Sequence, residues 1–154
     1  MKYQRAAFSL VELIIIVTFL SIFAFIAIPR LNYALISKQK AEATAWKIVT
    51  DLRLTRRLAI SDAANNVKGF ELSLIGSVPY HAYKITNLNT TKIISSHTTD
   101  SAVILSGPIG IKYAYTPLGN LKPASANKLI VSAEGRSFTI NVNPATGIVK
   151  CVEN

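Results

Sequence analysis

Glu12 is the one ionisable side chain in an apolar run that extends over residues 8–28. A helix of that length spans roughly 31 Å, the thickness of the hydrocarbon core of a bilayer, so the run predicts a transmembrane helix. A carboxylate inside such a run is costly unless a positive partner neutralises it. The chemistry that Glu12 predicts is therefore charge pairing, with extension of the side chain to the membrane interface as the alternative.

The residues around Glu12 form a pattern with a specific spacing. A short leader carries Lys2 and Arg5, and residues 7–13 read Ala-Phe-Ser-Leu-Val-Glu-Leu. This arrangement resembles the prepilin processing signal of the type IV pilin superfamily. A secretory signal peptide fits less well, because its apolar core would be shorter and would be followed by a small-residue cleavage site.

The resemblance implies a role for four residues. A prepilin peptidase would cleave between Ala7 and Phe8, and Phe8 would become the N-methylated first residue of the mature chain. The family usually has Gly at the position of Ala7. The new amine of Phe8 would pair with Glu12 of a neighbouring subunit. Pro29 matches a common position of a helix kink, since proline lacks the N–H for the i→i−4 hydrogen bond.

The elements that position these residues follow from the remaining pattern. From residue 30 to about residue 62, apolar residues recur at three- and four-residue spacing, which predicts an amphipathic helix continuous with the first apart from the region of Pro29. We expect its apolar stripe to pack on a C-terminal domain, with Trp46 as an anchor in the core. The stripe consists of Leu31, Leu35, Ala41, Ala45, Ile48, Val49, Leu52 and Ala59.

Beyond this helix, alternation of apolar and polar residues predicts short strands separated by Gly-, Pro- and Asn-containing turns. The candidate strands are residues 70–74, 80–86, 92–95, 102–105, 109–116, 128–133, 138–142 and 147–152. The predicted fold is α+β: a long N-terminal helix, half transmembrane and half amphipathic, packed on an antiparallel sheet or two-sheet sandwich. Its parts are a leader (1–7), a transmembrane and assembly helix (8–29), the amphipathic helix (30–64) and the β domain (65–154).

Later motifs are similar to those of the GspH/FimT family of minor pseudopilins and minor pilins. They are the late-helix stretch 51–60, residues 110–113 followed by Pro117 and Gly119, and the closing run 146–151. The resemblance implies a low-abundance subunit that assembles through its N-terminal helix into a type II secretion pseudopilus or a type IV pilus. Such a subunit acts near the filament tip, where assembly is initiated.

The same resemblance implies partners and a location. The partners are other pilins or pseudopilins, bound through the N-terminal helix, the prepilin peptidase and the inner-membrane assembly platform. The location is the bacterial inner membrane, spanned once, with a cytoplasmic N-terminus and a periplasmic C-terminal domain, and then the pilus or pseudopilus. A membrane-anchored domain that never polymerises is the alternative.

The resemblance leaves a further alternative, a minor pilin that binds DNA during natural transformation. Of the net charge of +9, only +3 lies within residues 58–154, which hold eight basic and five acidic residues. This charge is modest for DNA binding, although phosphate neutralisation needs only proximity and charge. Some family members bind DNA through a Gly-Arg-x-Arg loop, whose position here reads Gly-Ile-Val-Lys at 147–150. The candidate contacts for DNA or a protein partner are Arg136, Lys150, Lys112 and Lys128, together with Arg53, Arg56 and Arg57 on one side of the predicted helix, which otherwise form a solvated face.

Motifs for catalysis, cofactors and metals are missing from the sequence. It contains no nucleophile elbow, phosphate-binding loop or dinucleotide fingerprint, and no histidine pair at metal-ligand spacing. His81 and His97 are isolated, and the single cysteine, Cys151, excludes an internal disulfide. We therefore expect neither an enzyme nor a cofactor.

Overall fold

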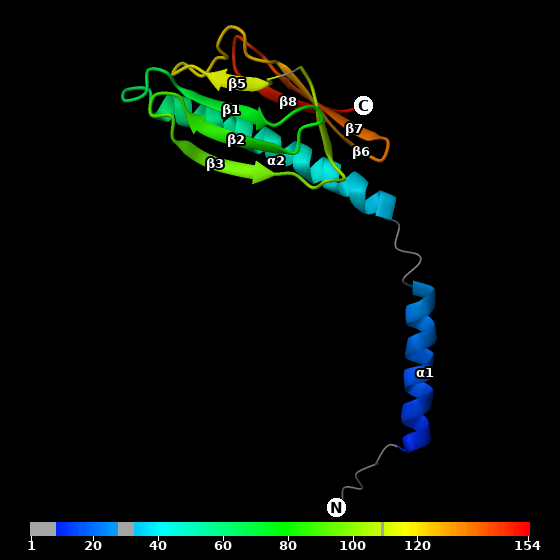
Figure 1. Ribbon diagram of the computed structural model, residues 1–154. Coiled ribbons are helices and arrows are strands. Elements are labelled where there is room, and N and C mark those ends of the chain that lie inside the picture. The colour runs from blue at the N-terminus through cyan, green and yellow to red at the C-terminus, as the bar shows by residue number, and fades with distance from the viewer. Residues whose placement is uncertain (1–8, 28–32, 109) are drawn as a thin grey trace, which may run out of the picture. The chain divides into compact units, whose positions relative to one another are not determined.

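The computed structural model describes residues 9–27, 33–108 and 110–154. The chain divides into two compact units, one within residues 1–33 and the other within residues 34–154 (Figure 1). The first unit contains helix α1, Leu10–Ala27. The second contains helix α2, Tyr33–Ser61, apart from its first residue, and all the described strands.

The prediction of a long N-terminal helix with a transmembrane half is wrong. Two separate helices, α1 and α2, are found among the described residues, in place of one helix that runs through residues 8–64. No helix in the described part of the chain is long and apolar enough to cross a membrane. The 18 residues of α1 reach about 27 Å, slightly less than the roughly 30 Å of the hydrocarbon core of a bilayer. The predicted single-pass location in the inner membrane is corrected by the same finding.

The apolar stripe of α2 forms as the three- and four-residue spacing predicts, but over a shorter length. Ala41, Ala45, Ile48, Leu52 and Ala59 are fully buried, each 0 % exposed. Leu35 and Trp46, which were expected in the core, are instead 55 % and 50 % exposed. Trp46 directly follows Ala45 and therefore lies about 100° around the helix from it, on the solvent side of α2.

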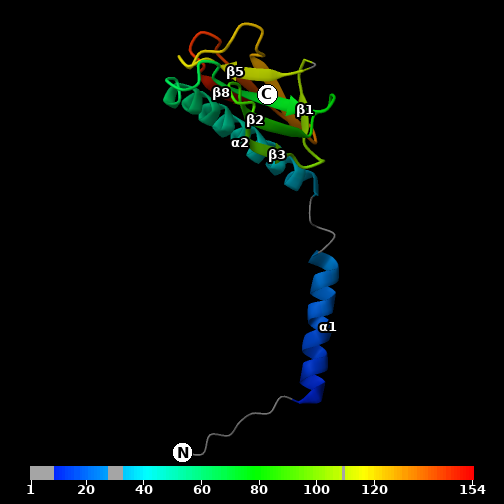
Figure 2. The ribbon, with the colours of Figure 1, turned by 60° about the vertical axis from the view of Figure 1, so that its left-hand side comes forward.

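The first sheet has the strand order β3-β2-β1-β5, all antiparallel. Its strands are β1 (Phe70–Ile75), β2 (Ala82–Asn87), β3 (Ile93–Thr98) and β5 (Lys112–Tyr115). The predicted alternation is visible in β1, where Phe70, Leu72 and Leu74 are buried and the residues between them are not. Both views show α2 beside β2 and β3 (Figures 1 and 2).

The second sheet has the strand order β4-β6-β7-β8 and is also antiparallel. Its strands are β4 (Ile104–Ser106), β6 (Lys128–Ala133), β7 (Arg136–Val142) and β8 (Val149–Glu153). Glu134 and Gly135 connect β6 to β7, and both have positive φ angles, 47° and 78°. A two-residue turn with positive φ at both positions matches the twist of a hairpin, so these residues fix the β6–β7 register.

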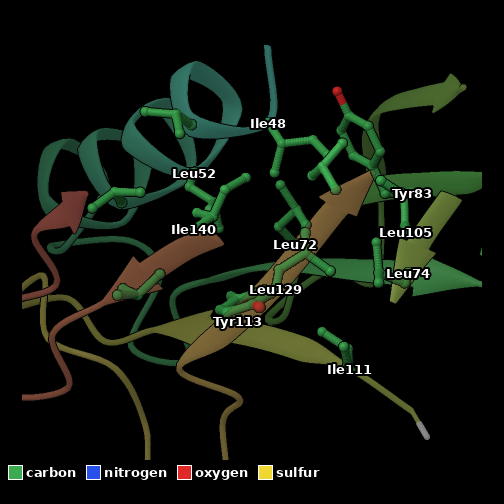
Figure 3. Packing of buried hydrophobic residues seen from close by; sticks show 14 of the residues in the cluster. Ile48, Leu52, Leu72, Leu74, Tyr83, Leu105, Ile111, Tyr113, Leu129 and Ile140 are labelled. Carbon is green, nitrogen blue, oxygen red and sulfur yellow. The ribbon is translucent and has the colours of Figure 1, made fainter. Parts of the chain in front are cut away.

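One hydrophobic core joins α2 to both sheets. Ile48 and Leu52 of α2 point toward Leu72 of β1 and Ile140 of β7 (Figure 3). Leu129 of β6 belongs to the same cluster and is 0 % exposed. The faces turned away from this core are the ones available for binding.

Candidate functional site

Helix α1 exposes an apolar surface. Twelve of its large apolar side chains, from Leu10 to Phe25, are between 46 % and 83 % exposed. The hydroxyls of Thr18 and Ser21 donate to the carbonyl oxygens of Ile14 and Val17, at 2.6 and 2.8 Å, and so are satisfied within the helix. Apart from Glu12, α1 therefore presents almost no polar group to a partner. A helix that is apolar on all sides is normally buried.

Glu12 lies in the first turn of α1, and it is exposed. A carboxylate in that position interacts favourably with the helix dipole, even without a partner. The other residues of the predicted processing and assembly site, Ala7, Phe8 and Pro29, lie outside the described residues. Of the four residues of that predicted site, Glu12 is therefore the one that lies within the described part of the chain.

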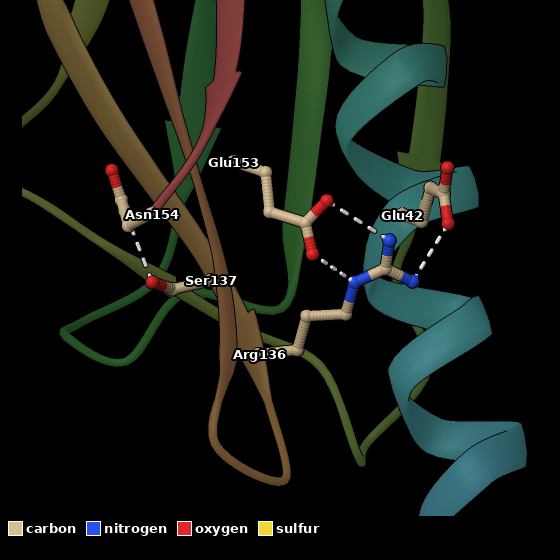
Figure 4. A network of polar contacts seen from close by, with 5 residues as sticks. All are labelled: Glu42, Arg136, Ser137, Glu153 and Asn154. Carbon is tan, nitrogen blue, oxygen red and sulfur yellow. Dashed lines mark hydrogen bonds and ion pairs between the residues drawn. The ribbon is translucent and has the colours of Figure 1, made fainter.

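Arg136 connects three elements of the second unit. Its Nε atom lies 2.5 Å from Glu153 Oε1 on β8, and its Nη1 atom lies 2.7 Å from Glu42 Oε2 on α2 (Figure 4). Its guanidinium carbon also lies 4.9 Å from the centre of the Phe138 ring. Because two carboxylates neutralise its charge, this predicted contact residue holds β7, β8 and α2 together and offers little charge to a ligand.

The ion pairs of Arg136 with Glu42 and Glu153 make the stability of the chain depend on pH. The hydrogen bonds from Arg136 lower the pKa of Glu153 below its ordinary value. A carboxylate with a lowered pKa stabilises the fold above its unfolded pKa, and this contribution is lost as the pH falls through the folded value. We therefore expect Arg136→Met to lower the urea midpoint of the full chain at about pH 6, and the deficit to shrink toward about pH 3.

Arg53→Met is the matched control for that experiment. Arg53 lies exposed on α2, and the structure gives it no ion pair with any described residue. Its substitution should leave the urea midpoint and its pH dependence close to those of the wild type. A deficit of Arg136→Met that stays constant between pH 6 and pH 3 would contradict the assigned role of Glu153.

A buried polar cluster that the sequence did not reveal lies between α2 and the first sheet. The hydroxyl of Tyr83 donates to Asp51 Oδ2 at 2.6 Å, and His97 Nε2 lies 3.7 Å from the same oxygen. The rings of Tyr83 and His97 are 5.4 Å apart, centre to centre. Burial, and then the hydrogen bond to Asp51, raise the pKa of Tyr83. Tyr83 of β2 and His97 of β3 thus provide polar partners for the Asp51 carboxylate, which α2 buries against these strands.

The predicted arginine group on α2 is divided by the structure. Arg56 Nε donates to the carbonyl oxygen of Gly119 at 2.9 Å, so that this arginine joins α2 to the loop after β5. Arg53 and Arg57 line a hollow of about 270 Å³ with Thr50 and Leu54. Arg53 also lines a second hollow, of about 210 Å³, together with Arg56 and the residues from Gly147 to Val149. The α2 arginines and the β7–β8 turn therefore share one surface.

The predicted lysine contacts lie on two different sheets. Lys112 belongs to β5 in the first sheet, whereas Lys128 and Lys150 belong to β6 and β8 in the second. Asn141 of β7 pairs with Lys128 on one side and with Lys150 on the other. The structure thus brings Lys128 and Lys150 to one face and separates them from Lys112 and Arg136.

Among the described residues, no group of three or more His, Cys, Asp or Glu side chains is arranged to hold a metal ion. Cys151 is unpaired and partly buried, and burial raises the pKa of its thiol. Comparisons with protein-family models, with curated proteins and with solved structures found no match for this chain.

Proposed function

We propose that this chain is a structural subunit of a pilin-like filament, and that it assembles with other subunits through α1. The observation that carries the proposal is the surface of α1, with twelve exposed large apolar side chains and one carboxylate. A contiguous apolar surface of that extent marks an interaction site, because its exposure to water is unfavourable. Packing of α1 helices from neighbouring subunits would cover it.

Glu12 gives this packing its register. Packing of apolar helices around a carboxylate removes water from it, and a buried charge without a partner is strongly destabilising. The resemblance to prepilins supplies the partner: the α-amine of Phe8 that cleavage after Ala7 would create on the adjacent subunit. Helices that slide past one another would separate the two charges, so that one axial offset is favoured over the others.

The finer assignment, to the minor pseudopilins and minor pilins, rests on the later motifs. Gly119 and Gly147 belong to those motifs, and each has a positive φ, 83° and 67°. Both glycines lie against Arg56, from the late-helix motif: a Cβ atom built on Gly119 or Gly147 would meet the Arg56 Nε at 3.2 or 3.0 Å. Three separate motifs therefore meet at one junction, which supports reading them together as one family signature.

Uptake of DNA has less support as a second function. Two carboxylates neutralise Arg136, and Arg56 is hydrogen bonded to Gly119. The loop at 147–150 has Ile148 and Lys150 where the DNA-binding members have arginines, so the planar fork that binds phosphate is missing.

Mass spectrometry of the chain from cells that contain a prepilin peptidase tests the processing step. The expected mature chain begins with an N-methylated Phe8. A chain that still begins with Met1 in such cells would overturn the proposal.

Substitution of Glu12 tests the assembly step. We expect Glu12→Ala to reduce incorporation into sheared filaments at least tenfold, because the partner amine would be buried without its counter-charge, at a cost of about 3 kcal/mol or more. Immunoblotting of filament and cell fractions measures this ratio. Thr18→Val, which removes a hydroxyl that bonds only within α1, is the matched control and should assemble normally. Normal assembly of Glu12→Ala would refute charge pairing.

A further inference from the structure

The outer face of the second sheet carries a row of polar residues across three strands. Asn141 of β7 lies directly between Lys128 of β6 and Lys150 of β8, as the register of the two ladders shows. All three side chains are exposed. They lie opposite the core, because the neighbouring residues Leu129, Ile140 and Val149 point inward and are buried.

The charge of this face has one sign. The side chains that alternate to the outside of β6, β7 and β8 are lysine, asparagine, serine, threonine, isoleucine and valine, and none of them is acidic. Neither Lys128 nor Lys150 forms an ion pair with another described residue. With neighbouring strands about 4.8 Å apart, the two ammonium groups project from points roughly 10 Å apart.

Two hollows border the row and share Asn127. The larger has a volume of about 440 Å³, and its polar lining includes Asn127, Asn141, Thr146 and Lys150. The smaller, of about 250 Å³, is lined on its polar side by Ser106, Asn127 and Lys128.

The amides in these hollows are available to a ligand. The side chains of Asn127 and Asn141 make no hydrogen bond to any other described residue. By contrast, the side-chain oxygen of Asn143 accepts hydrogen bonds from the backbone N–H groups of Ala145 and Thr146. Each free amide offers both donors and an acceptor, beside two unpaired positive charges.

These groups favour one class of ligand. The amides and hydroxyls that line the hollows match the hydroxyl groups of sugars, which donate and accept, and two ammonium groups roughly 10 Å apart match carboxylates that recur at a similar distance along a chain. Among the described residues, no aromatic side chain lines either hollow, so these residues form no stacking platform of the kind that binds single-stranded nucleic acid. We propose that the face formed by Asn127, Lys128, Asn141 and Lys150 binds an acidic polysaccharide that carries carboxylate groups.

Titration of the full chain with an oligogalacturonate hexamer, at low and at moderate salt, tests this site. We expect binding that weakens as salt rises, and a loss of affinity of about fivefold for Lys128→Gln and for Lys150→Gln. Asn141→Ala should also weaken binding about fivefold, through lost hydrogen bonds, but should keep the salt dependence of the wild type. Each variant changes an exposed side chain, and thermal unfolding would verify that it folds.

The controls separate this site from general attraction by a basic protein. Lys92→Gln removes the same charge from an exposed residue beside β3 in the other sheet, and it should bind the hexamer as the wild type does. Maltohexaose, a neutral hexamer, should neither bind nor compete. Three results would overturn the proposal: absence of hexamer binding at low salt, an equal loss for Lys92→Gln, or tighter binding of an oligothymidylate that the Lys128 and Lys150 variants also weaken, which would make the face a nucleic-acid site.

Discussion

Alanine at position 147 is expected to lower the free energy of unfolding by about 2–5 kcal/mol, because backbone strain and overpacking act together. Gly147 has a φ of 67°, in the left-handed region. A Cβ atom there would overlap the carbonyl oxygen of Gly119 and lie 3.0 Å from Arg56 Nε. Arg56 donates to that same carbonyl, so the turn that presents Ile148 and Lys150 must move. Urea denaturation of the full chain measures the loss.

Gly135→Ala separates the two causes of that loss. Gly135 has a similar φ of 78°, but a Cβ atom there would meet no other atom within 4 Å. We expect this control to lose only about 1 kcal/mol, the cost of a side chain in the left-handed conformation. Equal losses for the two variants would show that contact with Gly119 and Arg56 contributes nothing.

Leu52→Ala is the second change with a large expected effect, a loss of about 2–5 kcal/mol in the free energy of unfolding. Leu52 is 0 % exposed and belongs to the cluster that joins α2 to both sheets. Removal of its branched end would leave a cavity between elements that cannot close on one another without moving the helix. The loss should appear as a lower urea midpoint with an unchanged slope.

The matched control is Leu118→Ala, which removes the same atoms from a side chain that is 88 % exposed. Its free energy of unfolding should stay within about 0.5 kcal/mol of the wild type. A comparable loss for Leu118→Ala, or a loss below 1 kcal/mol for Leu52→Ala, would contradict the packing of α2 described above.

Short-range periodicity predicted much of the local structure. The alternation of Phe70, Leu72 and Leu74 marks β1, and the spacing of Ala41, Ala45 and Ile48 marks the buried stripe of α2. What the pattern overstated was continuity: the apolar run and the amphipathic stretch read as one helix, whereas the structure has α1 and α2. The exposure of Trp46 was missed because residue type, rather than position around the helix, suggested burial.

The polar sites could not be predicted from the sequence, because their members are far apart along the chain. Arg136 and Glu42 are separated by 94 residues, and Tyr83 and Asp51 by 32. Their meeting depends on how α2 lies against each sheet. The row of Lys128, Asn141 and Lys150 depends on the register of two ladders, in which a shift of one residue would move Asn141 to the core face. Those lysines were named from charge alone, without the asparagine between them.

Two ion pairs in the first half of α2 would have a mechanical consequence in the proposed filament, where α1 holds the subunit. Tension along the chain enters the second unit at the start of α2, and there Lys40 contacts Asp100 while Glu42 contacts Arg136. Asp100 follows β3 in the first sheet, and Arg136 begins β7 in the second. A pull on α2 is therefore shared between both sheets and, through Glu153, passed to β8. The ion pairs would thus carry part of the load to the segment after β3 and to strands β7 and β8, in addition to the helix itself.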